Sequence, residues 1–208
     1  MTTKVGKNLM INTVIFDIGN VLAAYDWQTS LKSYGFSAEK YEILADAVYR
    51  HTDWNEMDRG VLTVEEVTQR FISHAPQYAE DIRRLITDLH KTIWQFSYTK
   101  PLLKKLRADG YRLYYLSNYG EYGREQTADA LDFISLMDGG LFSYEVQMVK
   151  PNRWIYAEVC RRFDICPEEA IFFDDNRANV LAAREMGLQA EVFTSPEDVL
   201  ARLAISNN

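Results

Sequence analysis

The chain of 208 residues has little cysteine and no long apolar run. Its two cysteines, Cys160 and Cys166, are too few and too close in sequence to form a disulfide framework, so we expect reduced thiols. No apolar stretch reaches the roughly 18 residues that a membrane span requires, and the amino-terminal residues do not resemble a signal peptide. These absences predict a cytoplasmic protein.

Basic residues are fewer than acidic residues. The sequence has 23 Lys and Arg against 30 Asp and Glu, which gives a net charge of −7. Because an acidic surface repels polyanions, this charge disfavours nucleic acid or an anionic membrane as a partner. With 47% hydrophobic and 25% charged residues, the composition is that of a globular protein, which we expect to be a monomer or homodimer.

The pattern of apolar residues predicts a doubly wound α/β sheet. Residues 12–16 form a run that, after Asn12, is apolar or β-branched without polar alternation, as in a strand that is covered on both faces. Similar runs follow near residues 111–116, 142–149, 170–173 and 189–193. Between and after these runs, apolar residues recur at helical spacing over residues 102–110, 121–134, 151–163, 177–187 and from 196. Pro151 is expected to open the helix over residues 151–163. Strands that alternate with helices indicate parallel crossovers.

A long helical block interrupts this alternation after the first strand. From residue 29 to about 97 the apolar residues recur at helical spacing, and Thr63 and Glu66 stand at the spacing of a capping box. We therefore predict an all-helical domain over residues 28–97, inserted into an α/β domain formed by residues 1–27 and 98–208.

Short polar residues end several of the predicted strands. Ligands bind at the carboxyl ends of parallel strands, so these side chains are candidates for one site. Taken singly, a strand-ending Asp or Ser can also be a helix N-cap, and a lysine is most often a solvated surface residue. Two adjacent carboxylates, however, favour a metal ion that offsets their repulsion. The candidates are Asp17, Ser117, Asn118, Lys150, Asp174 and Asp175.

The segments "FDIGNV", "LSN", "VKP" and "FFDDN" contain these residues. In this order they resemble the four motifs of the haloacid dehalogenase superfamily of aspartate-nucleophile phosphohydrolases, and the resemblance covers nearly the whole chain. The helical insertion looks like the cap of that superfamily. The first and last motifs are most similar to the branch that contains bacterial α-D-glucose-1-phosphate phosphatase. The resemblance implies a phosphatase that acts on a small phosphorylated metabolite, most simply a sugar phosphate.

The resemblance also implies a role for each residue around a metal ion. Asp17 would be the nucleophile and would form an aspartyl-phosphate that water then hydrolyses. Mg²⁺ would be held by a carboxylate oxygen of Asp17, the backbone carbonyl of Gly19 and Asp175, and Asp174 would support this site from behind.

Three further residues would act on the phosphoryl group. Ser117 and Asn118 would bind its oxygens, while Lys150 would neutralise charge on both the nucleophile and the phosphoryl group. These are positioning and electrostatic roles.

Gly19 departs from the superfamily pattern. Most phosphatases of the superfamily carry a second aspartate there, which protonates the leaving oxygen and later activates water. General acid/base catalysis is typically worth ~10²–10⁴-fold in rate. Either the substrate has a better leaving group, such as an anomeric sugar oxygen, or the proton donor comes from elsewhere, with Asp26 or a residue of the helical insertion as candidates.

The segment "HTDWNEMDRG" has two interpretations. Asp58 and Arg59 can be structural or solvated residues at a turn. Alternatively, His51, Trp54 or Arg59 overhangs the site, contacts the leaving group and excludes water.

Two other functions fit the same motifs. A haloacid dehalogenase would use the same aspartate against carbon and would need no metal, which leaves the acidic pair without a purpose. A non-catalytic phosphate-binding protein would have lost the acid/base residue while it kept Asp17, Lys150 and both aspartates.

Overall fold

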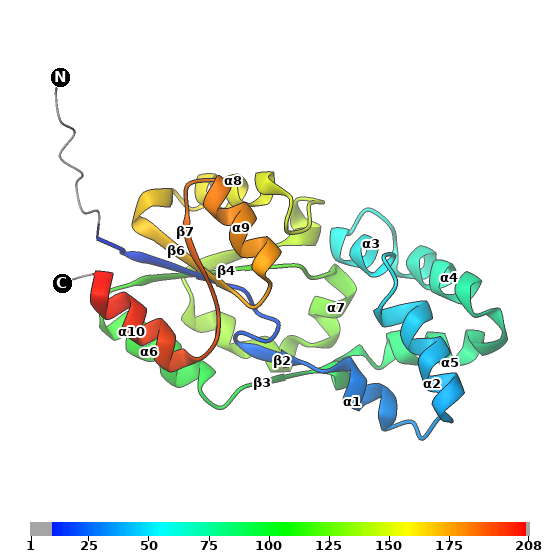
Figure 1. Ribbon diagram of the computed structural model, residues 1–208. Coiled ribbons are helices and arrows are strands. Elements are labelled where there is room, and N and C mark those ends of the chain that lie inside the picture. The colour runs from blue at the N-terminus through cyan, green and yellow to red at the C-terminus, as the bar shows by residue number, and fades with distance from the viewer. Residues whose placement is uncertain (1–9, 207–208) are drawn as a thin grey trace.

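A five-stranded parallel sheet forms the centre of the molecule in the computed structural model, which describes residues 10–206 (Figure 1). The strand order is β5-β4-β1-β6-β7, and β1 pairs with β4 on one side and β6 on the other. The strands are β1 (Thr13–Phe16), β4 (Arg112–Ser117), β5 (Gly139–Phe142), β6 (Ala170–Asp174) and β7 (Gln189–Val192). This arrangement confirms the predicted α/β fold class.

Helices cover both faces of the sheet (Figure 1). Val14 and Phe16 of β1 pack with α6 (Thr99–Ala108), the 3₁₀ segment η4 (Ala128–Leu136) and α10 (Pro196–Ser206). Ile15 points to the other face, against α8 (Arg153–Arg162) and α9 (Arg177–Glu185). Successive side chains of a strand point to opposite faces, so a strand covered on both sides is apolar at every position.

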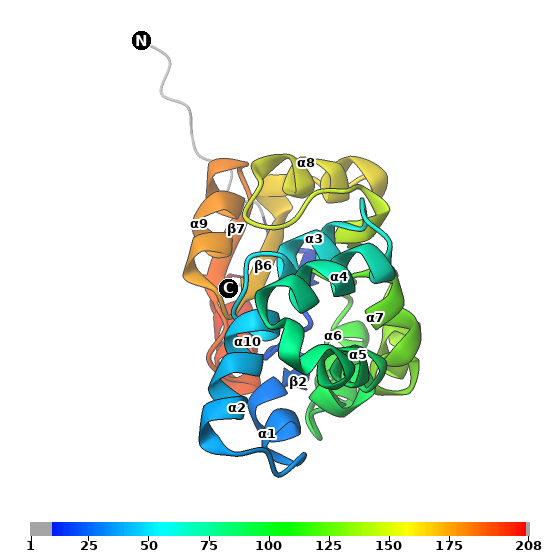
Figure 2. The same ribbon diagram turned by 90° about the vertical axis from the view of Figure 1, so that its right-hand side faces the viewer.

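The helical block lies between two short antiparallel strands, β2 (Ala23–Tyr25) and β3 (Ile93–Gln95), which sequence analysis did not predict. It comprises α1 (Trp27–Lys32), α2 (Ala38–Leu44), η1 (Ala45–Tyr49), α3 (Trp54–Arg59), α4 (Val64–His74), η2 (Pro76–Tyr78), α5 (Ala79–Thr87) and η3 (Leu89–Thr92). Figure 1 shows this block beyond the carboxyl ends of the sheet strands, and Figure 2 looks onto it. Its own apolar cluster includes Phe71, Ile82 and Leu85.

The ends of three helices were predicted from sequence, two of them correctly. The capping box of Thr63 and Glu66 forms at the start of α4, and Gly110 follows α6 with a φ of +91°. Pro151 does not open α8, because Asn152 is the N-cap and its side chain accepts a hydrogen bond from the N–H of Trp154.

Two predicted elements are corrected. The helix expected over residues 121–134 is divided into α7 (Glu121–Gln126) and the 3₁₀ segment η4. The strand expected near residues 142–149 is β5, which ends at Phe142. The short 3₁₀ segment η5 (Ser143–Glu145) follows it, so that Lys150 comes from a loop.

No helix within residues 10–206 has both the length and the apolar character of a membrane span. The expectation that the chain has no signal peptide falls partly on residues 1–9, which lie outside the described residues.

The separate apolar cluster of the helical block leads to a stability prediction. Phe71→Ala is expected to lower the free energy of unfolding of this block by about 3–5 kcal/mol, because a fully buried ring is replaced by a cavity. Hydrogen exchange should show faster exchange in α2, α4 and α5 while β1, β4 and β6 stay protected. Phe172→Ala, which alters the sheet core, is the matched comparison and should loosen the sheet. Equal loss of protection in both regions would contradict a separate domain.

Candidate active site

A cavity of about 330 Å³ lies where the sheet strands end beneath the helical block. From the sheet side it is lined by Asp17, Ser117, Asn118, Lys150 and Asp175, and Gly19 also faces it. The structure therefore brings together residues that lie far apart in sequence. Neither Asp17 nor Ser117 is a helix N-cap, because β2 follows Asp17 and Gly120 is the N-cap of α7.

Lys150 forms the centre of this cluster. It is only 4% exposed, so the interpretation as a solvated surface lysine is wrong. Its ammonium nitrogen lies 2.8 Å from Oδ1 of Asp17 and 2.7 Å from Oδ2 of Asp174, and it donates to the carbonyl of Leu116 at 2.9 Å. Burial disfavours the charged form, but Asp17 and Asp174 outweigh it and raise the pKa of Lys150. The lysine is therefore a fixed positive charge.

Asp174 holds Lys150 in place and is not among the residues that line the cavity. Its side chain is fully buried and accepts hydrogen bonds from the N–H of Asn176 at 2.8 Å and from Nδ2 of Asn179 at 3.0 Å. With Lys150 added, both carboxylate oxygens have partners. The supporting role expected for Asp174 at a metal site stays a prediction, and Asn179 shares in the contacts that fix this carboxylate.

Asn118 is fastened to Lys150 through both ends of its amide. The backbone N–H of Lys150 donates to Oδ1 of Asn118 at 2.7 Å, and Nδ2 of Asn118 donates to the carbonyl of Lys150 at 3.0 Å. The side chain thus ties the lysine loop to the end of β4. Its expected contact with a phosphoryl oxygen stays a prediction.

Asp17 lies between two opposing electrostatic effects. Burial raises its pKa, Lys150 lowers it and Asp174 raises it again, with a net result of about 6. A hydrogen bond from Ser117 further favours the ionised form, and Oδ1 accepts the N–H of Ile18 at 2.7 Å. The carboxylate is consequently ionised at neutral pH and fixed in orientation.

The donor set at the cavity fits a hard divalent cation. Oxygen atoms of Asp17, Asp174 and Asp175 lie within 4.8 Å of one another, while Lys150 supplies one positive charge among them. Asp175 is exposed and accepts a hydrogen bond from Asn20 at 3.2 Å. Since carboxylate and carbonyl oxygens are the ligands that Mg²⁺ prefers, Asp17, Gly19 and Asp175 are suited to hold it.

The opposite wall of the cavity comes mainly from the helical block. Trp54, Met57 and Asp58 of α3 line it together with Tyr25 of β2. Of the residues expected to overhang the site, Trp54 does so, whereas His51 and Arg59 are not among those that line the cavity.

Arg59, which was expected to overhang the site, and Asp26, which was a candidate proton donor, have other contacts. Arg59 lies 3.4 Å from Glu56. Asp26 caps α1 by accepting the N–H of Thr29 at 2.8 Å and is also absent from the lining.

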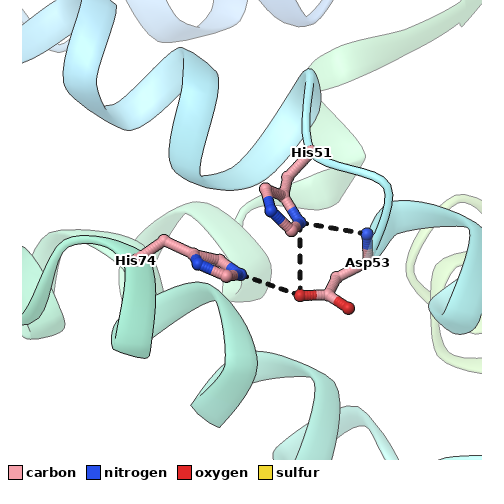
Figure 3. A group of neighbouring side chains, drawn as sticks. All are labelled: His51, Asp53 and His74. Atoms are coloured by element: carbon pink, nitrogen blue, oxygen red, sulfur yellow. Dashed lines mark hydrogen bonds and ion pairs between the residues drawn. The ribbon is translucent and has the colours of Figure 1, made fainter.

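His51, Asp53 and His74 form a second convergent cluster, which sequence analysis missed (Figure 3). Oδ2 of Asp53 lies 2.8 Å from Nε2 of His74 and 3.2 Å from Nδ1 of His51. The two rings stack with centroids 3.8 Å apart and planes inclined by 30°. Arg70 already lies beside Asp53. The cluster therefore joins the start of α3 to α4 by hydrogen bonds.

The comparisons with known proteins agree with this geometry. A family model for haloacid dehalogenase-like hydrolases matches residues 11–187. The chain belongs to this family. Among solved structures, the fold is similar to a HAD family enzyme from Bacteroides thetaiotaomicron in complex with magnesium and inorganic phosphate. The TM-score is 0.69 and the identity 22%, over 88% of this chain and 94% of that one.

Relatives of this haloacid dehalogenase-like hydrolase include a phosphatase. The sesquiterpene phosphatase astK of Aspergillus oryzae is 25% identical over 84% of this chain and 85% of its own length. The drimenol cyclase drtB of Aspergillus calidoustus is 25% identical over 93% of this chain, which spans only 36% of that protein.

The buried lysine gives a prediction on pH and stability. Lys150→Met is expected to lower the free energy of unfolding at pH 8 by about 3–5 kcal/mol, because it leaves Asp17 and Asp174 buried without their cation. The loss should shrink as the pH falls, since a carboxyl whose pKa is raised in the folded state destabilises the fold above that pKa and ceases to do so when protonated. Urea unfolding at pH 8 and pH 5 measures both effects.

Lys100→Met is the control for this change. Lys100 forms an exposed ion pair with Asp132, and such pairs contribute only about 0–1 kcal/mol. A similar small effect of Lys150→Met, unchanged by pH, would contradict the central role given to Lys150.

Proposed function

We propose that the protein is a Mg²⁺-dependent phosphatase that hydrolyses a small phosphorylated metabolite through an aspartyl-phosphate intermediate. One observation carries the proposal: the carboxylate of Asp17 faces the cavity while the buried Lys150 ammonium holds it at 2.8 Å. An ionised, fixed carboxylate is what nucleophilic attack on phosphorus requires. The family match and the phosphatase among the relatives support the reaction class.

In the first step, an oxygen of Asp17 would attack phosphorus in line with the leaving oxygen. Lys150 would offset charge on both groups, and Ser117, Asn118 and the backbone amides from Ile18 to Asn20 would receive the phosphoryl oxygens. When bound by Asp17, the carbonyl of Gly19 and Asp175, Mg²⁺ would supply further neutralisation of the phosphoryl charge. Water would then release phosphate and restore Asp17.

We propose a sugar phosphate as the substrate class, as in the α-D-glucose-1-phosphate phosphatase branch. A cavity of about 330 Å³ suits a small molecule. Its wall combines the rings of Tyr25 and Trp54, whose centroids lie 6.1 Å apart, with the polar side chains of Thr92 and Asp58. Rings can stack on a sugar face while polar groups bind its hydroxyls. The acidic composition argues against nucleic acid or an anionic membrane as a partner. We propose in addition a cytoplasmic monomer or homodimer.

A dehalogenase is the alternative enzyme. It would attack carbon with the same Asp17 and would leave three clustered carboxylates with only the charge of Lys150 to balance them. The excess of negative charge beside Lys150 therefore favours the phosphatase.

The first functional prediction concerns the nucleophile. With Mg²⁺ present, the wild-type chain should hydrolyse members of a panel of sugar 1-phosphates, sugar 6-phosphates, aryl phosphates and prenyl phosphates, while Asp17→Asn should lose this activity and the acid-stable, hydroxylamine-labile phosphoryl adduct. Asp26→Asn, which alters only a helix cap, should retain both. A preference for prenyl phosphates would replace the proposed substrate class, and an inert wild-type chain would favour a non-catalytic phosphate-binding protein.

Metal removal provides a second prediction. A chelator should abolish phosphate release, and Mg²⁺ should restore it, because the carboxylates of Asp17 and Asp175 then regain their cation. Asp175→Asn should raise the Mg²⁺ concentration required for half-maximal activity. Halide release from 2-haloacids that persists in the chelator, without phosphatase activity, would instead identify a dehalogenase.

A further inference from the structure

Gly19 leaves the proposed reaction without a proton donor at the usual position. Resting on the proposed phosphatase function, we propose that Asp58, contributed by α3 of the helical block, is the general acid and base of the reaction. Its place on the wall of the cavity that also contains Asp17, near enough for the two charges to interact, carries this assignment. Sequence analysis gave Asp58 a structural or solvated role, since nothing in its local pattern places it over a strand end.

Asp58 shares the cavity with both Asp17 and Gly19. The charges of Asp17 and Asp58 lie close enough for Asp17 to raise the pKa of Asp58. At Gly19 the nearest atom to an added Cβ would be Cβ of Tyr25, at 3.9 Å, so this side of the nucleophile is open. A leaving group bound to phosphorus at Asp17 would therefore lie in the same cavity as Asp58.

The backbone of Asp58 is fixed to the sheet domain. Its carbonyl accepts a hydrogen bond from Oγ of Ser143 at 2.5 Å, and its carboxylate accepts the backbone N–H of Gly120. A Cβ on Gly120 would lie 2.6 Å from the carbonyl oxygen of Met57, so glycine is required for this close approach. The hydrogen-bonded cluster of His51, Asp53 and His74 secures the other end of α3 (Figure 3). These contacts hold the carboxyl group in one place.

The surroundings of Asp58 suit a group that carries a proton. Within residues 10–206 no cationic side chain forms an ion pair with it. Burial and the charge of Asp17 raise its pKa to about 7, an effect that the hydrogen bond from Gly120 and the charge of Lys150 only partly oppose. A carboxyl group in this range can give up and regain a proton near neutral pH. Asp26, the other acidic candidate, is occupied as a helix cap.

Asp58 would give up its proton in the first step of the reaction and regain one in the second. An oxygen of Asp17 forms a bond to phosphorus, the bond from phosphorus to the leaving oxygen breaks, and the proton of Asp58 passes to that oxygen, so the product leaves as an alcohol. Asp58, now a carboxylate, takes a proton from water as the water oxygen attacks phosphorus. The bond to Asp17 then breaks, phosphate is released, and Asp58 is protonated again.

The test uses Asp58→Asn and two substrates that differ in leaving group. For the alkyl phosphate that the wild-type chain hydrolyses best, kcat/KM should fall by ~10²–10⁴-fold, the usual worth of a general acid. For 4-nitrophenyl phosphate it should fall by less than about tenfold, because nitrophenolate departs without a proton. Asp58 also acts in the second step, so the variant should release a burst of one equivalent of nitrophenolate before a slow steady state.

A second variant separates chemistry from folding. Gly19→Asp in the Asp58→Asn background places a carboxyl group at the open position beside the nucleophile and should recover alkyl phosphate hydrolysis. Asp26→Asn is the control and should leave both substrates unaffected.

The possible outcomes separate the two proposals. Equal losses of kcat/KM for both substrates in Asp58→Asn, without a burst and without recovery in the double variant, would overturn the role of Asp58 while an active wild-type chain keeps the phosphatase proposal intact. A wild-type chain that is inert toward both substrates would overturn the proposed function, and the role of Asp58 with it.

Discussion

The site depends on one buried cation, the ammonium group of Lys150. It lies between Asp17 at the end of β1 and Asp174 at the end of β6, and it also donates to Leu116 of β4. Three adjacent strands of the sheet thus share one charge. Because an ion pair in a protein interior is favourable only when its remaining hydrogen-bonding groups are satisfied, the amides of Asn118 and Asn179 belong to the same unit.

This unit also explains why the site is suited to a divalent cation. Lys150 offsets part of the negative charge of the three carboxylates, and Asp174 uses both its oxygens within the protein. The remaining excess of charge lies on Asp17 and Asp175, at the surface of the cavity. Without this cation Asp17 and Asp174 would be buried unpaired, and the carboxylate of Asp17 would lose the contact that fixes its orientation.

Much of the sheet domain could be predicted from sequence because its signals are local. Apolar runs that end in small polar residues predict both the strands and the edge at which Asp17, Ser117 and Asp175 meet. The strands β2 and β3 have three residues each, too few to establish a period. The two hydrogen bonds between the side chain of Asn118 and the backbone of Lys150 join residues that are far apart in sequence, and no local sequence pattern predicts them. Helical spacing predicts the inserted helices but not which of them faces the site.

Asp58 could not be assigned from sequence for this reason, because helical spacing does not show that α3 faces the site. The groups proposed to act on phosphorus follow the strands of the sheet, whereas α3 of the helical block contributes Asp58 to the cavity wall. The contact between Ser143 and the carbonyl of Asp58 joins the two domains at the residue proposed to move the proton. If the helical block opens to admit substrate, this contact breaks and Asp58 moves away from Asp17. When the block closes, it excludes water and at the same time returns Asp58 to the site. A proton donor on the moving domain would therefore confine efficient cleavage of alkyl phosphates to the closed form, a coupling that an aspartate at position 19 would not provide.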